Sequence, residues 1–206
     1  MKHFFILILL LVSFSSCNKK TVLLPEIQSS DIIEIKDVSP AYIFYDITKP
    51  DSVEFNRKNL IGTTNWLVNV DKRLTLKQAM PHIKFLQEKR RNAKMHKNEN
   101  AKNYFTCNDT SRNNLGFIDF TDVVYSVKKE SVISKEFPNS AIIYFAKKSI
   151  SFNGKLIKLE QLNTLEGNLV LSFDSSLTFQ DYIMYKSLLL RIDSPNMTII
   201  SQEFIY

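Results

Sequence analysis

The chain has 206 residues, of which 44% are hydrophobic and 12% aromatic, and its formal net charge is +6 at pH 7. This composition can build a packed core, which excludes a disordered tail, and the length suits one domain or two small ones. Glycine is scarce, with 4 residues. Neither GxGxxG nor GxxxxGK[ST] occurs, so the glycine-rich phosphate-binding loops are excluded.

The N-terminal sequence has the pattern of an export signal. Lys2 precedes an apolar run from Phe4 to Val12, and serines lead from there to Cys17. A basic start, a short apolar segment and a small-residue cleavage zone are typical of a secretory signal. The apolar stretch 4–14 is shorter than the roughly 20 residues that span a bilayer. We therefore expect residues 1–16 to be a signal peptide, with an uncut signal anchor as the alternative.

The stretch Phe14-Ser15-Ser16-Cys17 resembles the lipobox of bacterial lipoproteins, with Phe14 where that family usually has Leu. The resemblance implies cleavage before Cys17 and attachment of a diacylglycerol, and then of palmitate-type chains, to this residue. The lysine- and asparagine-rich composition is similar to that of Bacteroidetes lipoproteins. No aspartate run follows Cys17 of the kind that marks surface export in that group. We therefore expect a lipid anchor in the cell envelope, in the outer membrane facing the periplasm.

Residues 17–30 are expected to form the lipidated cysteine and a tether, and residues 31–206 a folded domain with possible halves 31–137 and 138–206. The first half alternates apolar runs with polar turns, and Thr75 with Gln78 fits a capping box at a helix start. In chain order, we expect a strand or short helix at 31–38, a strand at 41–47, a loop at 48–64, a strand at 66–70, a helix at 75–96 kinked or started late by Pro81, a strand at 104–107, one or two strands at 115–125 and a charged break at 126–139.

The second half is more regular. Asn153-Gly154 is a favoured hairpin turn, and Thr178 with Asp181 fits a second capping box. The expected elements are a strand at 141–146, a hairpin at 150–157, a short helix at 159–165, a strand at 168–173, a helix from 178 and a strand at 198–206. The sequence therefore predicts an α+β fold, with a mixed or antiparallel sheet, two to three helices packed on it and a C-terminal ββαβαβ unit.

The stretch from Ser149 to Leu162, with the strand 169–174 that follows, resembles the periplasmic domain of ExbD and TolR. That domain has a strand, an Asn-Gly hairpin, a helix, a strand ending in Asp, a further helix and an edge strand. The family also has a transmembrane helix with an essential acidic residue, whereas residues 4–16 contain neither Asp nor Glu. The resemblance thus implies an envelope binding module without proton coupling. The segment 65–120 could be a degenerate first copy of the same unit.

Basic residues gather in the helix expected at 75–96. Such a helix can bind nucleic acid, anionic headgroups or an acidic partner. Export to the envelope disfavours nucleic acid, and a solvated helix face is the alternative to a specific partner. The candidate anionic-partner face consists of Lys77, Lys84, Arg90, Arg91 and Lys94.

Catalytic signatures are sparse. Cys107 is the one cysteine after Cys17, and only His82 and His96 follow the signal as candidate bases. The two histidines do not have the spacing of zinc ligands, and we expect neither a metal nor a cofactor. The sequence therefore favours a lipid-anchored, non-catalytic binding module with an envelope protein partner. The alternatives are an envelope thiol enzyme that uses Cys107 and a binder of an apolar ligand.

Overall fold

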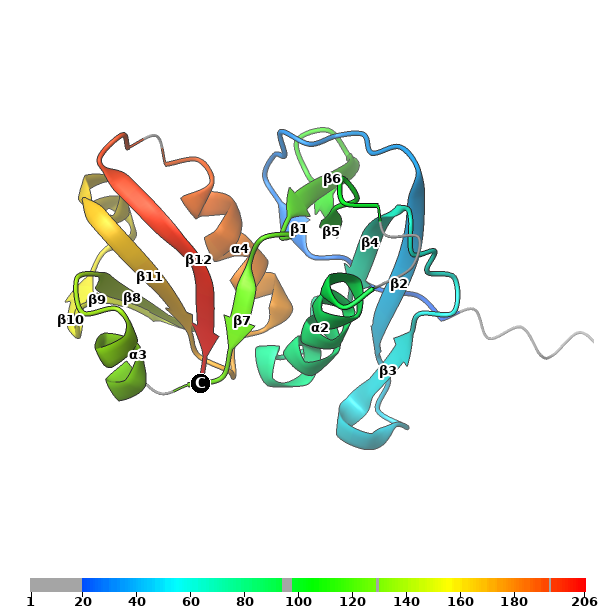
Figure 1. The fold of residues 1–206 in the computed structure, drawn as a ribbon, viewed down its shortest axis with the longest axis horizontal. Helices are drawn as coiled ribbons and strands as arrows, with labels where there is room; N and C mark the ends of the chain where they lie inside the picture. Colours follow the sequence, from blue (N-terminus) through cyan, green and yellow to red (C-terminus); the bar gives the residue numbers. More distant parts are fainter. Residues whose placement is uncertain (1–19, 94–97, 129, 193) are drawn as a thin grey trace, which may run out of the picture.

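A computed structural model describes residues 20–93, 98–128, 130–192 and 194–206. Within these ranges the chain forms two six-stranded mixed sheets, with helices α2 and α4 between them (Figure 1). The predicted α+β class is confirmed. The predicted signal peptide, Cys17, Lys94 and His96 lie outside the described residues.

The first sheet and helix α2 make up the N-terminal unit. Strands β2, β4 and β5 run parallel in the order β2-β4-β5, β3 pairs antiparallel with β2, and both β1 and β6 pair with β5. Its elements are β1 (Glu26–Ile27), β2 (Val38–Tyr45), η1 (Pro50–Ser52), β3 (Val53–Asn56), β4 (Asn65–Val70), α2 (Leu76–Arg91), β5 (Asn103–Asp109) and β6 (Asn114–Asp119).

The second sheet, with helices α3 and α4, makes up the C-terminal unit. Its strand order is β10-β9-β8-β11-β12-β7, with β8, β11, β12 and β7 parallel and the β8–β9–β10 strands antiparallel. Its elements are β7 (Val124–Ser126), α3 (Glu130–Glu136), β8 (Ala141–Ala146), β9 (Ser149–Phe152), β10 (Lys155–Ile157), η2 (Leu159–Thr164), β11 (Gly167–Phe173), α4 (Phe179–Leu189) and β12 (Met197–Ile205).

Several expected elements differ from the observed ones. The loop expected at 48–64 contains strand β3, and the charged break at 126–139 contains helix α3. Helix α2 ends at Arg91 instead of residue 96, and it continues through Pro81 from a start at Leu76. The element expected at 31–38 is irregular, with Ile32 making only an isolated bridge to Phe117.

The chain passes from one sheet to the other between Asp119 and Val124, because β7 and α3 both belong to the C-terminal unit. Helix α3 covers the outer face of the second sheet, where Ile133 packs with Ile142, Val170 and Phe204. The alternate residues Leu169, Leu171 and Phe173 point to the opposite face and join the main core, as the pleat of a strand requires.

The two units share this main core. The ring of Phe105 in β5 stacks on Phe120 at 3.8 Å and meets Phe179 of α4 edge-on at 5.2 Å between centroids. Tyr182 of α4 contacts both Phe105 and Phe173, so it joins the two sheets. Because the aromatic contacts cross between the units, we expect the described chain to unfold as one cooperative body.

Candidate functional site

Each unit contains the same strand–turn–helix segment. Residues 70–76 and 173–179 have the same sequence pattern: an apolar residue, Asp, two variable residues, Leu, Thr and a second apolar residue. The Asp side chain accepts a hydrogen bond from the backbone two residues on: Asp71 from Arg73 N (3.1 Å) and Asp174 from Ser176 N (2.8 Å). Thr75 and Thr178 then cap α2 and α4, each in a capping box.

These two segments meet and exchange backbone hydrogen bonds around the Thr75–Thr178 bridge. Leu76 N donates to the carbonyl of Leu177 (2.8 Å), and Phe179 N donates to that of Leu74 (2.6 Å). Lys77 N donates to Ser175 O (2.9 Å), and Gln180 N donates to Lys72 O (3.2 Å). The bonds are reciprocal, so the junction has a local pseudo-two-fold axis. Each helix therefore begins beside the turn of the opposite unit, and from that point the two helices present equivalent faces.

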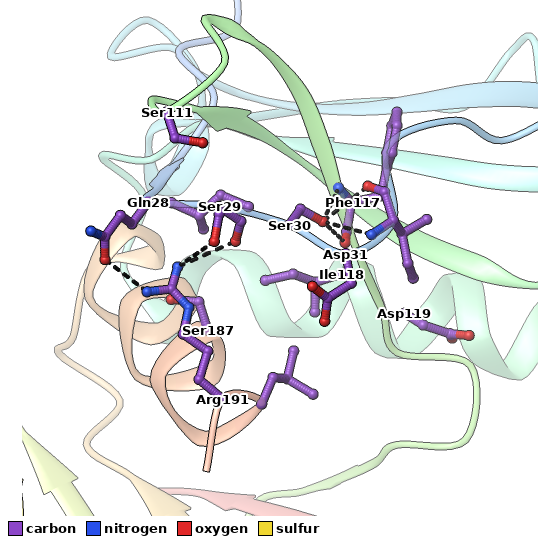
Figure 2. A pocket seen from close by; sticks show the side chains of 13 residues that line it. Gln28, Ser29, Ser30, Asp31, Ser111, Phe117, Ile118, Asp119, Ser187 and Arg191 are labelled. Carbon is purple, nitrogen blue, oxygen red and sulfur yellow. Dashed lines mark hydrogen bonds between the residues drawn. The ribbon is translucent and has the colours of Figure 1, made fainter. Parts of the chain in front are cut away.

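The groove along α4 is filled by residues 23–29. The carbonyl of Leu23 accepts from Lys72 N (2.7 Å), and the Gln180 side chain bonds to both the N–H and the carbonyl of Glu26 (2.8 and 2.9 Å). Arg191, at the end of α4, donates to the Gln28 side chain (2.8 Å) and to Ser29 (Figure 2). Ile27 is 4% exposed. The tether prediction is therefore wrong for these residues, because they are a packed part of the fold.

A cavity of about 500 Å³ remains where this segment turns away from α4 towards β6 (Figure 2). Its polar groups already hold the chain in place. Ser30 Oγ lies within hydrogen-bond distance of the carbonyls of Ile32 and Phe117, which share its one hydroxyl proton, and the Ser30 N–H donates to Asp109 (2.9 Å). Although burial raises the pKa of Asp109, hydrogen bonds from Ser111 and Arg112 bring it down to about 2. The polar groups at this cavity therefore fix the N-terminal segment to the rest of the fold.

The groove along α2 is not filled by any segment that the structure describes. It has a volume of about 680 Å³, and two large apolar side chains in it are exposed: Phe85 at 41% and Val127 at 70%. Lys77, Lys84 and Glu88 form its polar rim on α2. The complete lining is Leu76, Lys77, Met80, Pro81, Lys84, Phe85, Glu88, Val127, Ser175, Ile205 and Tyr206. We call this surface the α2 groove.

The α2 groove is the counterpart of the filled groove under the pseudo-two-fold. Counting from Thr75 and Thr178, the α2 residues Lys77, Lys84 and Glu88 correspond to Gln180, Ser187 and Arg191. Gln180 and Ser187 lie on α4, and Arg191 lies just after its end. Tyr206 stands where Leu23 does, since its carbonyl accepts from Ser175 N (2.9 Å) as that of Leu23 accepts from Lys72 N. The same helix face is thus covered by residues 23–29 in one unit, whereas in the other no segment within the described residues covers it.

The predicted basic residues separate into different places. Lys77 and Lys84 line the α2 groove, and Arg91 is exposed near β7, where it donates to the carbonyl of Val123 (2.9 Å). Arg90 does not share their face. It is 8% exposed, its guanidinium lies 3.9 Å from the Trp66 ring centroid, and burial lowers its pKa to about 10. The cause is helical spacing, because Arg90 falls on the same buried face as Ile83 and Gln87.

The candidate thiol lies in the core. Cys107 is fully buried in β5, and burial raises the pKa of its thiol. A nucleophilic cysteine requires the opposite shift. The candidate base His82 packs against the Phe55 ring at 4.9 Å, and burial lowers its pKa.

The described parts of the chain contain no helix with the length and apolar character to cross a membrane. They also contain no group of three or more His, Cys, Asp or Glu side chains placed to hold a metal ion. Comparison with protein-family models, curated proteins and solved structures finds no match to this chain.

Proposed function

We propose that the chain is a lipid-anchored binding module of the bacterial cell envelope, and that the α2 groove is where a partner protein binds. The observation that carries this proposal is the groove itself. It combines a floor of apolar side chains with a lysine rim, and it leaves Phe85 and Val127 exposed to solvent. Exposed apolar patches rimmed by polar residues mark interaction sites. The anchor is Cys17, on the strength of the lipobox-like sequence before it.

The two alternatives have less support. A thiol enzyme would need an accessible, low-pKa cysteine, whereas Cys107 is buried with a raised pKa. A small apolar ligand would favour a closed cavity, since such sites bury most of the ligand surface. The α2 groove instead runs along an exposed helix face and carries charged groups at its rim.

Anchoring and binding are tested separately. Changing Cys17 to Ser should release the protein from the membrane fraction, and a variant that stays bound and uncut would refute the anchor. For binding, the envelope of intact cells is crosslinked and the protein is purified with its adducts. The double variant Lys84→Glu/Val127→Glu should lose a specific adduct that the wild type forms.

A matched control is available on the β9–β10 hairpin. Lys155 and Leu156 are also an exposed lysine and an exposed apolar residue, and Leu156 is 78% exposed. The variant Lys155→Glu/Leu156→Glu makes the same change of charge and polarity outside the groove, so it should keep the adduct. Equal adducts in both double variants would contradict binding at the α2 groove.

A further inference from the structure

We infer that the α2 groove takes an extended peptide segment of the partner, apolar in character and carrying a carboxylate. The inference rests on the proposed binding function and goes further by naming the form and chemistry of what binds. It follows from a comparison within the molecule, because the counterpart groove along α4 is already occupied.

The occupant of the α4 groove shows what this surface accommodates. Residues 23–29 cross α4, and within them Glu26–Ile27 form the extended strand β1, which runs parallel to β5. The groove fixes them through the backbone of Glu26, which both polar ends of the Gln180 side chain contact, and through Arg191 at the far end of the helix. The apolar side chain of Ile27 is buried beneath.

Applying the pseudo-two-fold rotation to residues 23–29 places an equivalent segment along α2. An equivalent segment would follow on from the position of Tyr206, as residues 24–29 follow on from Leu23, and it would lie over Lys77, Lys84 and Glu88. The junction at Thr75 and Thr178 keeps both grooves in the same relation to their helices, because the backbone hydrogen bonds there are reciprocal. The two grooves differ in that no described segment covers the rim of the second.

The side chains of the α2 groove specify the chemistry of the peptide. Met80 forms part of the floor with Ile205, while Phe85 and Val127 offer exposed apolar surface for side chains of the segment. Among the lining side chains, Lys77 and Lys84 are basic and Glu88 is acidic. An acidic side chain in the segment would pair with these lysines. In the filled groove the segment also places a carboxylate in an ion pair, between Glu26 and Lys72 at 2.6 Å, although the counterpart of Lys72 is Ser175.

The test uses the lipidated full-length chain in lipid nanodiscs and a fluorescent peptide that copies residues 21–29, which include the segment that lies along α4. Anisotropy should show saturable binding. The variant Lys84→Glu/Val127→Glu should bind the peptide roughly tenfold more weakly or worse, and Lys155→Glu/Leu156→Glu should bind it as the wild type does. Both variants change exposed or half-exposed residues, and equal unfolding midpoints verify that they fold.

A second probe needs no change in the protein. The same peptide with Gln in place of its Glu should bind the wild type several-fold more weakly at low salt, and its affinity should depend less on salt. No saturable binding up to about 1 mM peptide would overturn the inference. Equal affinity of both double variants, or loss of binding on Gln180→Ala alone, would also overturn it, because the peptide would then lie elsewhere or in the α4 groove.

The outcomes separate this inference from the proposed function. A groove-dependent adduct in envelopes together with absent peptide binding would refute the extended peptide and leave the binding module standing. Loss of both would refute both.

Discussion

Replacing Gln180 with Ala should loosen the N-terminal segment while the rest of the fold is kept. The Gln180 side chain makes hydrogen bonds to the N–H and the carbonyl of Glu26, at 2.8 and 2.9 Å. Each such bond contributes about 0.5 to 1.5 kcal/mol net, so local opening of the segment should become easier by about 1 to 3 kcal/mol. Since these bonds are solvent-exposed, we expect the lower end, roughly a fivefold rise in the opening equilibrium.

Hydrogen–deuterium exchange with mass spectrometry measures this directly on the peptide spanning residues 22–30. The matched control is Lys77→Ala, which changes the residue in the equivalent position of the α2 groove. Exchange of residues 22–30 should rise in Gln180→Ala and stay at the wild-type level in Lys77→Ala. If both variants behave alike, the asymmetry between a filled and an open groove is wrong.

Three further outcomes test the fold and the buried groups. Leu177→Ala should cost about 2 to 5 kcal/mol of unfolding free energy in a denaturant titration, because the side chain is fully buried at the junction of the units; a cost under about 1 kcal/mol would contradict a shared core. Burial raises the pKa of Asp109, but its hydrogen bonds bring the pKa to about 2, below the unfolded value of about 3.9. The carboxylate should therefore stabilise the folded state fully above about pH 4, and this stabilisation should decline as the pH falls towards 2. Urea midpoints from pH 5 to 2 should show this decline, and Asp109→Asn should flatten it. Burial raises the pKa of the Cys107 thiol, so a thiol probe at neutral pH should react more slowly with Cys107 than with a model thiol. A faster reaction with Cys107 would support the thiol-enzyme alternative.

The elements with strong local signals were predictable. Thr75 with Gln78 and Thr178 with Asp181 mark the starts of α2 and α4, and the structure has a capping box at each. The hairpin turn at Asn153-Gly154 has positive φ at both residues, 48° and 78°, as this dipeptide favours. These features depend on a few neighbouring residues, so a single sequence is enough to locate them.

The missed elements depend on contacts that are distant in the chain. Strand β3 is four residues long, is half-buried throughout, and is defined by its pairing with β2. Helix α3 is short and polar and places Ile133 in a small cluster on the outer face of the second sheet. Neither has the length or the periodic apolar pattern from which a helix or strand can be recognised.

The candidate site was only partly visible in the sequence. Lys77 and Lys84 were found from charge alone, but charge could not separate them from Arg90, whose guanidinium packs on the Trp66 ring. The shared pattern of 70–76 and 173–179 was a usable signal for the internal repeat. The difference between the two grooves arises because residues 23–29 cross α4 and no described segment crosses α2. This path of the chain is not visible in any local sequence pattern.

The most direct test of the account places a photoreactive amino acid in the groove in living cells. A benzoylphenylalanine at position 127 lies in the α2 groove, and one at position 156 lies on the β9–β10 hairpin at similar exposure. The account predicts one defined protein adduct from position 127, none from position 156, and loss of the adduct when Cys17 is also changed to Ser. Equal adducts from both positions, or none from position 127, would contradict it.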